Sequence, residues 1–306
     1  NYLGAVKGML ELQNDPDYET LYMVADVHTL TTPYNIEQLR INRREVMIDY
    51  LAAGLDPEKS ILFQQSEVNQ HTELAFYLSS VTTIAKMQHL PTFKDKVKQY
   101  PEHATMALLN YPVLMSADIM VYKAELVPAG LDQEPHLEVS REIARRMNQD
   151  YGTDFPEPKR FATKGDYVPS LTGEGKMSKS VEGSFINLTD DLETIRAKIR
   201  KVPTATEAGG EKSHGLQALF SFLQIIAPSE VERFESSFAS GSLKFVELKD
   251  TIAQAVYNEL KPLQERRTEL EANPEKVNRI IKEGNEKARS IATRTCLEVR
   301  EKMGLS

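Results

Sequence analysis

The sequence predicts an α/β protein in which a doubly wound parallel sheet is followed by a C-terminal all-helical domain. Over the first half of the chain, short apolar runs alternate with helical patterns of apolar residues. Beyond about residue 185 the strand signals stop, and a glycine-rich stretch at 164–183 joins the two parts. Alternating strands and helices are typical of parallel α/β folds. We therefore expect one domain at residues 1–185 and a helical domain at residues 186–306.

The first expected strand is Leu21–Ala25, an apolar run bounded by polar residues, as in strands buried on both faces. The helix after it opens with Asn35 and Gln38, which match a capping box. The next expected elements are a strand at 61–63, a helix at 74–81, an apolar segment at 126–128 and a helix from Asp132 to Met147. Helical repeats follow at 192–199, 216–223, 248–260 and 277–303. Ligands of such sheets bind beyond the carboxyl ends of the strands, so residues there are the first candidates for a site.

Composition and charge exclude several classes of protein. A net charge of −8, from 37 basic and 45 acidic residues, argues against a protein that coats nucleic acid non-specifically. The single cysteine, Cys296, excludes a disulfide framework and any cysteine-based metal cluster within the chain, and it fits a reducing compartment. Since no apolar run approaches the roughly 18 residues of a membrane span, and Asn1–Leu12 lacks a signal-peptide pattern, we expect a cytoplasmic protein without a membrane partner.

The strongest local signal is the segment Gly175–Ser180, in which Lys176 and Lys179 flank Met177 and Ser178. Two lysines on a glycine-flanked loop can close over a polyphosphate and neutralise charge that develops in a transition state. The segment is not a Walker A loop, because Met177 stands where Ser or Thr would hold Mg²⁺. For a bare pair of lysines at this spacing, a solvated surface loop would be the ordinary interpretation.

The complete Lys-Met-Ser-Lys-Ser string resembles the signature loop of class I aminoacyl-tRNA synthetases, and the chain as a whole resembles their bacterial-type tryptophanyl branch. The matching segments are Asn1–Ala5, Asp26–Thr31, Phe93–Lys96, Tyr111–Asp118 and Val127–Gln133. This resemblance implies a Rossmann-like catalytic domain that includes the loop at 176–180, and a helical domain that binds the tRNA anticodon. It also implies a homodimer whose substrates are L-tryptophan, ATP with Mg²⁺, and tRNA(Trp).

Met115 and Asp118 indicate which amino acid is bound. We expect them on one face of a helix started by Pro112. The family places this pair against the indole, whose N–H is only a donor and matches a carboxylate, while Met offers a soft apolar wall. Tyrosyl enzymes typically carry Gln near the position of Met115. The resemblance adds three tryptophan contacts: His28, Tyr111 and Gln133.

The resemblance also implies the ATP site. Gly130 and Asp132 match its ribose contacts, since glycine allows close backbone approach and a carboxylate accepts hydroxyl protons. Lys96, together with Lys176 and Lys179, would stabilise the departing pyrophosphate. A helix cap at Asp132 and a solvated charged face at Lys96 are the alternatives. The remaining implied ATP contacts are Asn1, Val168, Met177 and Ser178. No protein side chain is expected to bind metal, since Mg²⁺ would come with ATP.

Several departures from the family pattern leave alternatives open. Leu131 replaces a usual Glu, Val27 replaces a Gln, and Glu134–Pro135 replace a polar, basic pair. Most of the first class I signature lies before Asn1, and we expect a chain without it to be impaired. A tyrosyl-tRNA synthetase, a non-catalytic paralogue that binds nucleotide or RNA, and another adenylyl-transferring enzyme are the competing interpretations.

Overall fold

The computed structural model describes residues 2–162, 168–173, 175, 177, 181–204 and 211–306. The chain forms two compact units. The α/β unit comprises Ala5–Thr163 and Leu270–Ser306, and the helical unit comprises Asn1–Gly4 and Lys164–Glu269. This division differs from the one expected at residue 185, because the last helix packs into the core of the α/β unit and Val168 and Leu171 pack into the core of the helical unit.

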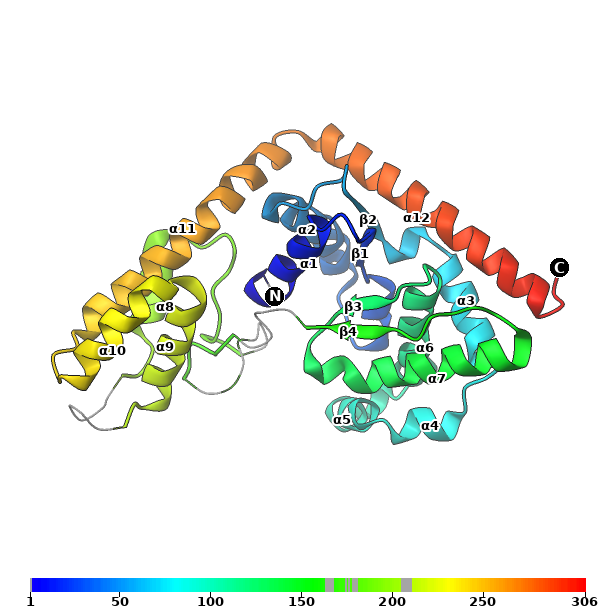
Figure 1. Cartoon of the computed structure of the whole chain (residues 1–306), viewed down its shortest axis with the longest axis horizontal. Coiled ribbons are helices and arrows are strands. Elements are labelled where there is room, and N and C mark those ends of the chain that lie inside the picture. The colour runs from blue at the N-terminus through cyan, green and yellow to red at the C-terminus, as the bar shows by residue number, and fades with distance from the viewer. Residues whose placement is uncertain (1, 163–167, 174, 176, 178–180, 205–210) are drawn as a thin grey trace. The chain divides into compact units, whose positions relative to one another are not determined.

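The α/β unit alternates strands and helices as expected (Figure 1). Its elements are α1 (Lys7–Gln13), β1 (Thr20–Val24), α2 (Ile36–Ala53), β2 (Ser60–Gln64), α3 (Gln70–Ser79), α4 (Ile84–His89), α5 (Pro91–Gln99), α6 (Met106–Met120), β3 (Leu126–Pro128), α7 (Glu134–Tyr151), β4 (Lys159–Phe161) and α12 (Pro274–Lys302). Strands β1 and β2 pair in parallel, from Thr20 opposite Ser60 to Val24 opposite Gln64. Strands β3 and β4 form a second parallel pair. Sequence patterns did not predict β4, which has only three residues, none of them buried.

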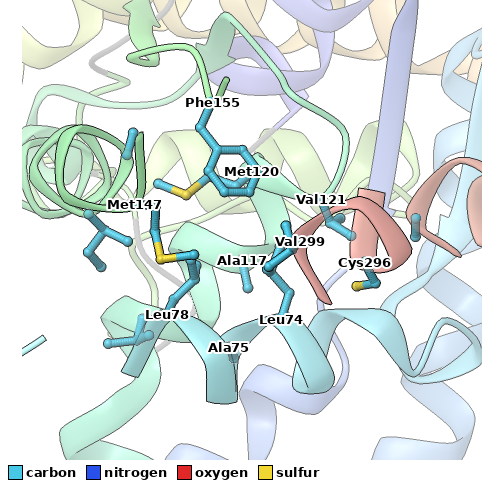
Figure 2. Packing of buried hydrophobic residues seen from close by; sticks show 14 of the residues in the cluster. Leu74, Ala75, Leu78, Ala117, Met120, Val121, Met147, Phe155, Cys296 and Val299 are labelled. Carbon is cyan, nitrogen blue, oxygen red and sulfur yellow. The ribbon is translucent and has the colours of Figure 1, made fainter. Parts of the chain in front are cut away.

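The core of the α/β unit lies where α3, α6 and α7 meet α12 (Figure 2). Leu74 and Leu78 on α3 are fully buried, as is Ala117 on α6, and Met147 of α7 packs into the same cluster. Side chains at positions three and four apart share one face of a helix, so each of these helices turns its apolar stripe inward. The helix pattern predicted at 74–81 is confirmed by α3.

Helix α12 lies directly against strand β2, and a glycine makes this close approach possible. A Cβ atom at Gly284 would stand 1.9 Å from the carbonyl oxygen of Leu62. The next residue, Asn285, accepts a hydrogen bond at its Oδ1 from the backbone N–H of Gln64, at 2.9 Å. Residues about 220 positions apart in sequence are therefore joined at the strand that leads to the candidate site.

The helical unit is built on α8 (Leu192–Arg200), α9 (His214–Ile226), α10 (Val231–Ala239) and α11 (Phe245–Glu271). Its hydrophobic core includes Ile195, Ile199, Leu216, Leu219, Leu248 and Ile252. Buried Lys249 donates to the carbonyl oxygens of Arg200 and Val202 and thereby satisfies the end of α8. In the part of the chain that the structure describes, we find no helix with the length and apolar character needed to cross a membrane.

Replacing Gly284 with Ala should destabilise the α/β unit by about 2 kcal/mol or more, the range for overpacking a core. The added methyl group would collide with backbone rather than with a movable side chain. Urea denaturation measures the change, and Glu283→Ala, at an exposed position of the same helix, is the matched control. Equal midpoints for both variants would contradict this role of Gly284.

Candidate active site

The candidate site begins at the carboxyl ends of β1 and β2, where the parallel pairing places two short 3-10 helices. The first, Val27–Thr31, holds His28, and the second, Gln65–Glu67, holds Gln65. Buried Asp26 ties them together, since its carboxylate accepts from the backbone N–H and the hydroxyl of Ser66 at 2.9 and 2.6 Å. Arg43 of α2 pairs with the same carboxylate at 2.5 Å. These contacts hold the segments that follow β1 and β2 against each other.

One face of α6 supplies Tyr111, Met115 and Asp118, as the spacing predicts. The expectation that Pro112 starts this helix was wrong. The helix begins at Met106, because Thr105 caps it by accepting from the N–H of Leu108, and Pro112 lies inside it. Proline has no N–H to donate within the helix, so the turn before it lacks one backbone hydrogen bond.

The carboxylate of Asp118 is the centre of a buried hydrogen-bond network. Its Oδ1 accepts from Gln65 Nε2 at 2.8 Å and lies 2.6 Å from Nδ1 of His71, while its Oδ2 lies 3.0 Å from the same amide nitrogen of Gln65. The side chain of Asp118 is 12% exposed and that of His71 is fully buried. Gln65 also accepts from the backbone N–H of His28 at 3.2 Å, so both strand ends are connected to Asp118.

A second network orients Tyr111. Its hydroxyl donates to Thr92 Oγ1 at 2.7 Å and lies 2.6 Å from Nε2 of His136, while its ring meets that of His28 edge-on at 5.2 Å. Nδ1 of His136 is buried without a partner in the described structure. A buried bare acceptor is tolerated better than a buried unpaired N–H, so we place the proton on Nε2, where it is donated to Tyr111.

Burial sets the protonation of this second network. It lowers the pKa of His136, which the neighbouring His28 lowers further and Asp132 partly restores. Burial also lowers the pKa of His28, against the opposing effect of Asp118. The pKa of Tyr111 is raised by burial, so its hydroxyl keeps its proton. Both imidazoles therefore favour the neutral form at neutral pH.

The segment before α7 contains Gly130 and Asp132, the two residues that were expected to contact the ribose of ATP. Gly130 precedes a 3-10 helix, Leu131–Gln133, and a Cβ at Gly130 would stand 2.4 Å from Oδ1 of Asp132. Any larger residue at 130 would therefore displace that carboxylate. Gln133 donates to Oδ2 of Asp132 at 2.8 Å. The alternative interpretation of Asp132 as a helix cap is not supported, because neither this 3-10 helix nor α7 has a side-chain cap.

The other predicted residues are not brought into these networks. Lys96 lies on α5 and donates to Gln99 of the same helix at 3.0 Å. Val168 is buried in the core of the helical unit, where it accepts from the N–H of half-buried Met177 at 2.9 Å. Asn1, Lys176, Ser178 and Lys179 lie outside the described residues. The roles expected for all of them remain predictions.

Sequence patterns missed residues of both networks. Gln65 directly follows a strand, so its position at a strand end was a usable signal. His136 stands three residues beyond Gln133, in the first turn of α7. The hydroxyl of Tyr122 belongs to the first network, since it lies 2.9 Å from Nε2 of His71. His71, Tyr122 and Thr92 gave no signal, because their partners lie 47, 51 and 19 or more residues away in sequence.

Comparison with known families agrees with this fold. Residues 2–267 match the family model described as "tRNA synthetases class I (W and Y)". That match covers most of the chain, including both networks, so the protein belongs to the class I aminoacyl-tRNA synthetases.

Curated relatives and solved structures indicate which branch of the class I synthetases the chain belongs to. The tryptophan–tRNA ligase of Porphyromonas gingivalis is 38% identical over 99% of this chain and 94% of its own length, and that of Treponema pallidum is 35% identical over 100% and 93%. The structure of Campylobacter jejuni tryptophanyl-tRNA synthetase complexed with ADP and tryptophan has 29% identity and a TM-score of 0.86, covering 100% of this chain and 95% of that one. The chain is a bacterial-type member of the tryptophanyl-tRNA synthetases, with their Rossmann-like fold and helical C-terminal domain.

The neutral state of His136 makes stability depend on pH. Because its pKa is lower in the folded chain than in the unfolded chain, the free energy of unfolding should decrease as the pH falls through about 6.5. His136→Gln keeps a donor for Tyr111 but does not titrate. The free energy of unfolding of this variant should therefore decrease less over the same pH range. Urea unfolding above and below that pH measures the difference, with exposed His89→Gln as control. Equal pH dependence in wild type and His136→Gln would contradict the assignment.

Proposed function

We propose that this chain activates L-tryptophan with ATP and transfers it to tRNA(Trp), using the site around Asp118 to recognise the amino acid. The observation that carries the proposal is the carboxylate of Asp118, held by Gln65 and His71 on the helix face that also presents Met115 and Tyr111. Full-length similarity to tryptophan–tRNA ligases supports it.

The proposed reaction has two steps. An oxygen of the tryptophan carboxylate forms a bond to the α-phosphorus of ATP, and the bond from that phosphorus to the bridging oxygen breaks, which releases pyrophosphate. A ribose hydroxyl at the tRNA terminus then attacks the acyl carbon, loses its proton, and displaces AMP. No protein nucleophile is required, so catalysis consists of positioning and electrostatic stabilisation. We assign the electrostatic stabilisation of the departing pyrophosphate to Lys176, Lys179 and Lys96.

Amino-acid recognition is assigned to the two networks. Asp118 would accept from the indole N–H, which can only donate, and half-buried Met115 would lie against the flat ring. Tyr111, His28 and Gln133 are assigned to the remainder of the amino acid. A site built around a buried polar partner rejects analogues that lack the matching group strongly, by up to ~10⁴–10⁵ in the best cases.

Nucleotide binding is assigned to Gly130 and Asp132 at the ribose, with Asn1, Val168, Met177 and Ser178 as the further contacts. Among the residues described, no group of three or more His, Cys, Asp or Glu side chains is arranged to hold a metal ion. We assign Mg²⁺ to the phosphates of ATP, whose charge it would neutralise.

The expected anticodon-binding role is assigned to helices α8 to α11 of the helical unit, in a cytoplasmic homodimer. We name no anticodon residue, because the basic run on α8 is engaged in ion pairs, as Arg196 with Glu193 and Arg200 with Asp250 show. Exposed apolar side chains gather before and on α2, at Leu30, Tyr34, Ile36 and Ile41. Such a group is a candidate for coverage by a second copy.

Tryptophan-dependent exchange of pyrophosphate into ATP tests the activation step, with Tyr and Phe as competing substrates. We expect exchange with tryptophan alone. Asp118→Asn should lower kcat/KM for tryptophan roughly 10- to 100-fold, the equivalent of a hydrogen bond to a charged group at about 1.5–3 kcal/mol. Asp150→Asn, an exposed position on α7, should leave it unchanged. Exchange with Tyr would refute the indole assignment, and ATP binding without exchange would favour a non-catalytic paralogue.

Lys179→Ala should lower kcat of the exchange reaction about 100- to 1000-fold, by analogy with the loss of one preorganised donor to a transition-state charge. KM for tryptophan should change little, because the lysine acts on the phosphates. Steady-state exchange kinetics separate the two constants, and exposed Lys201→Ala serves as the control. A rise in KM at unchanged kcat would show that Lys179 is not one of the catalytic lysines.

A further inference from the structure

We propose that His71 and Tyr122 are positioning residues that hold the carboxylate of Asp118 in one orientation and turn its Oδ2 toward the ligand, so that the site selects for a ring N–H donor. The inference rests on the proposed function, since it concerns the same amino-acid site. It adds two residues that do not themselves touch the ligand, and it states what each hydrogen bond does.

The imidazole of His71 is fixed in both position and orientation. Its side chain is fully buried, and both ring nitrogens have partners: Nδ1 lies 2.6 Å from Asp118 Oδ1 and Nε2 lies 2.9 Å from the hydroxyl of Tyr122. Phe63 of β2 stacks on the ring at 5.9 Å, and Tyr122 meets Phe63 edge-on at 5.3 Å. A ring enclosed in this way cannot rotate without breaking two hydrogen bonds.

The hydrogen-bond partners also determine where the proton of His71 resides. Burial and the charge of Asp118 raise the pKa of Tyr122, so the phenol keeps its proton and donates it to Nε2 of His71. With Nε2 acting as the acceptor, the neutral ring carries its proton on Nδ1 and donates it to Asp118. The order of donation is therefore from Tyr122 to His71 and from His71 to Asp118.

This arrangement leaves the two oxygens of Asp118 unequal. Oδ1 accepts the short contacts from His71 and Gln65, whereas Oδ2 has the single longer one of 3.0 Å to Gln65 in the described structure. Oδ2 is thus the oxygen with capacity for a further donor, on a side chain that is 12% exposed.

An analogue in which sulfur replaces the indole N–H tests this role. β-(Benzothiophen-3-yl)alanine keeps the shape of tryptophan but offers no donor. The chain contains no Trp residue, so the fluorescence of bound L-tryptophan can be followed directly, and calorimetry gives the Kd of the analogue. The measured quantity is the ratio of the two Kd values, with exchange kinetics measured in parallel.

We expect wild type to prefer tryptophan. His71→Leu should reduce the preference about 10-fold, as a hydrogen-bonded charged acceptor loses its orientation. His71→Asn, which restores a donor near the position of Nδ1, should recover most of it. Tyr122→Phe keeps the ring and removes only the hydroxyl, so it should fold and reduce the preference by a few fold. Tyr77→Phe, which removes a hydroxyl bonded to Glu73 away from the site, should change nothing.

The outcomes separate the inference from the function on which it rests. Two outcomes would overturn the inference and assign both residues a merely structural role. One is that His71→Leu weakens the binding of tryptophan and of the analogue equally, and the other is that Tyr122→Phe leaves the ratio of their Kd values unchanged. A wild-type preference that depends on His71 in a chain without exchange activity would support the inference and overturn the proposed activation step.

Discussion

The parallel pairing of β1 with β2 is the constraint on which the candidate site depends. It places Val24 opposite Gln64, so the residues that follow each strand emerge at the same edge. Asp26 then bonds to Ser66 across that edge, and Gln65 bonds to the backbone of His28. A shift of the pairing by one residue would turn every side chain of the strand to the opposite face and separate these groups.

The polar site also depends on the apolar core beneath it. Helices α3 and α6 pack through Leu74, Leu78 and Ala117 (Figure 2). This packing brings His71 of α3 to Asp118 of α6. A buried carboxylate is tolerated only when it is hydrogen-bonded, and here its donors come from β2's end and from α3. Loss of core packing would therefore also misalign the hydrogen bonds of the network, which weaken as their distances and angles depart from the preferred range.

Local patterns predicted what is locally determined. The cap at Asn35 is confirmed, because its side chain accepts from the N–H of Gln38 at 2.9 Å, although the side chain of Gln38 turns to Asn42 and the capping box does not close. The face shared by Met115 and Asp118 followed from helical spacing alone. The return of α12 to the α/β unit did not follow, because an amphipathic pattern shows which face is buried and not against what.

Hydrogen bonds among Thr92, Tyr111 and His136 connect the elements to which the proposed subsites belong. Thr92 stands one turn before Lys96 on α5, Tyr111 shares its helix with Asp118, and His136 follows the segment that holds Asp132. Displacement of any one of these elements must therefore stretch a contact of 2.6–3.2 Å at Tyr111 or His136. Groups that meet reacting atoms must be held in place before the substrate arrives. These hydrogen bonds would let the amino acid, the ribose and the phosphates be positioned together rather than by three independent segments.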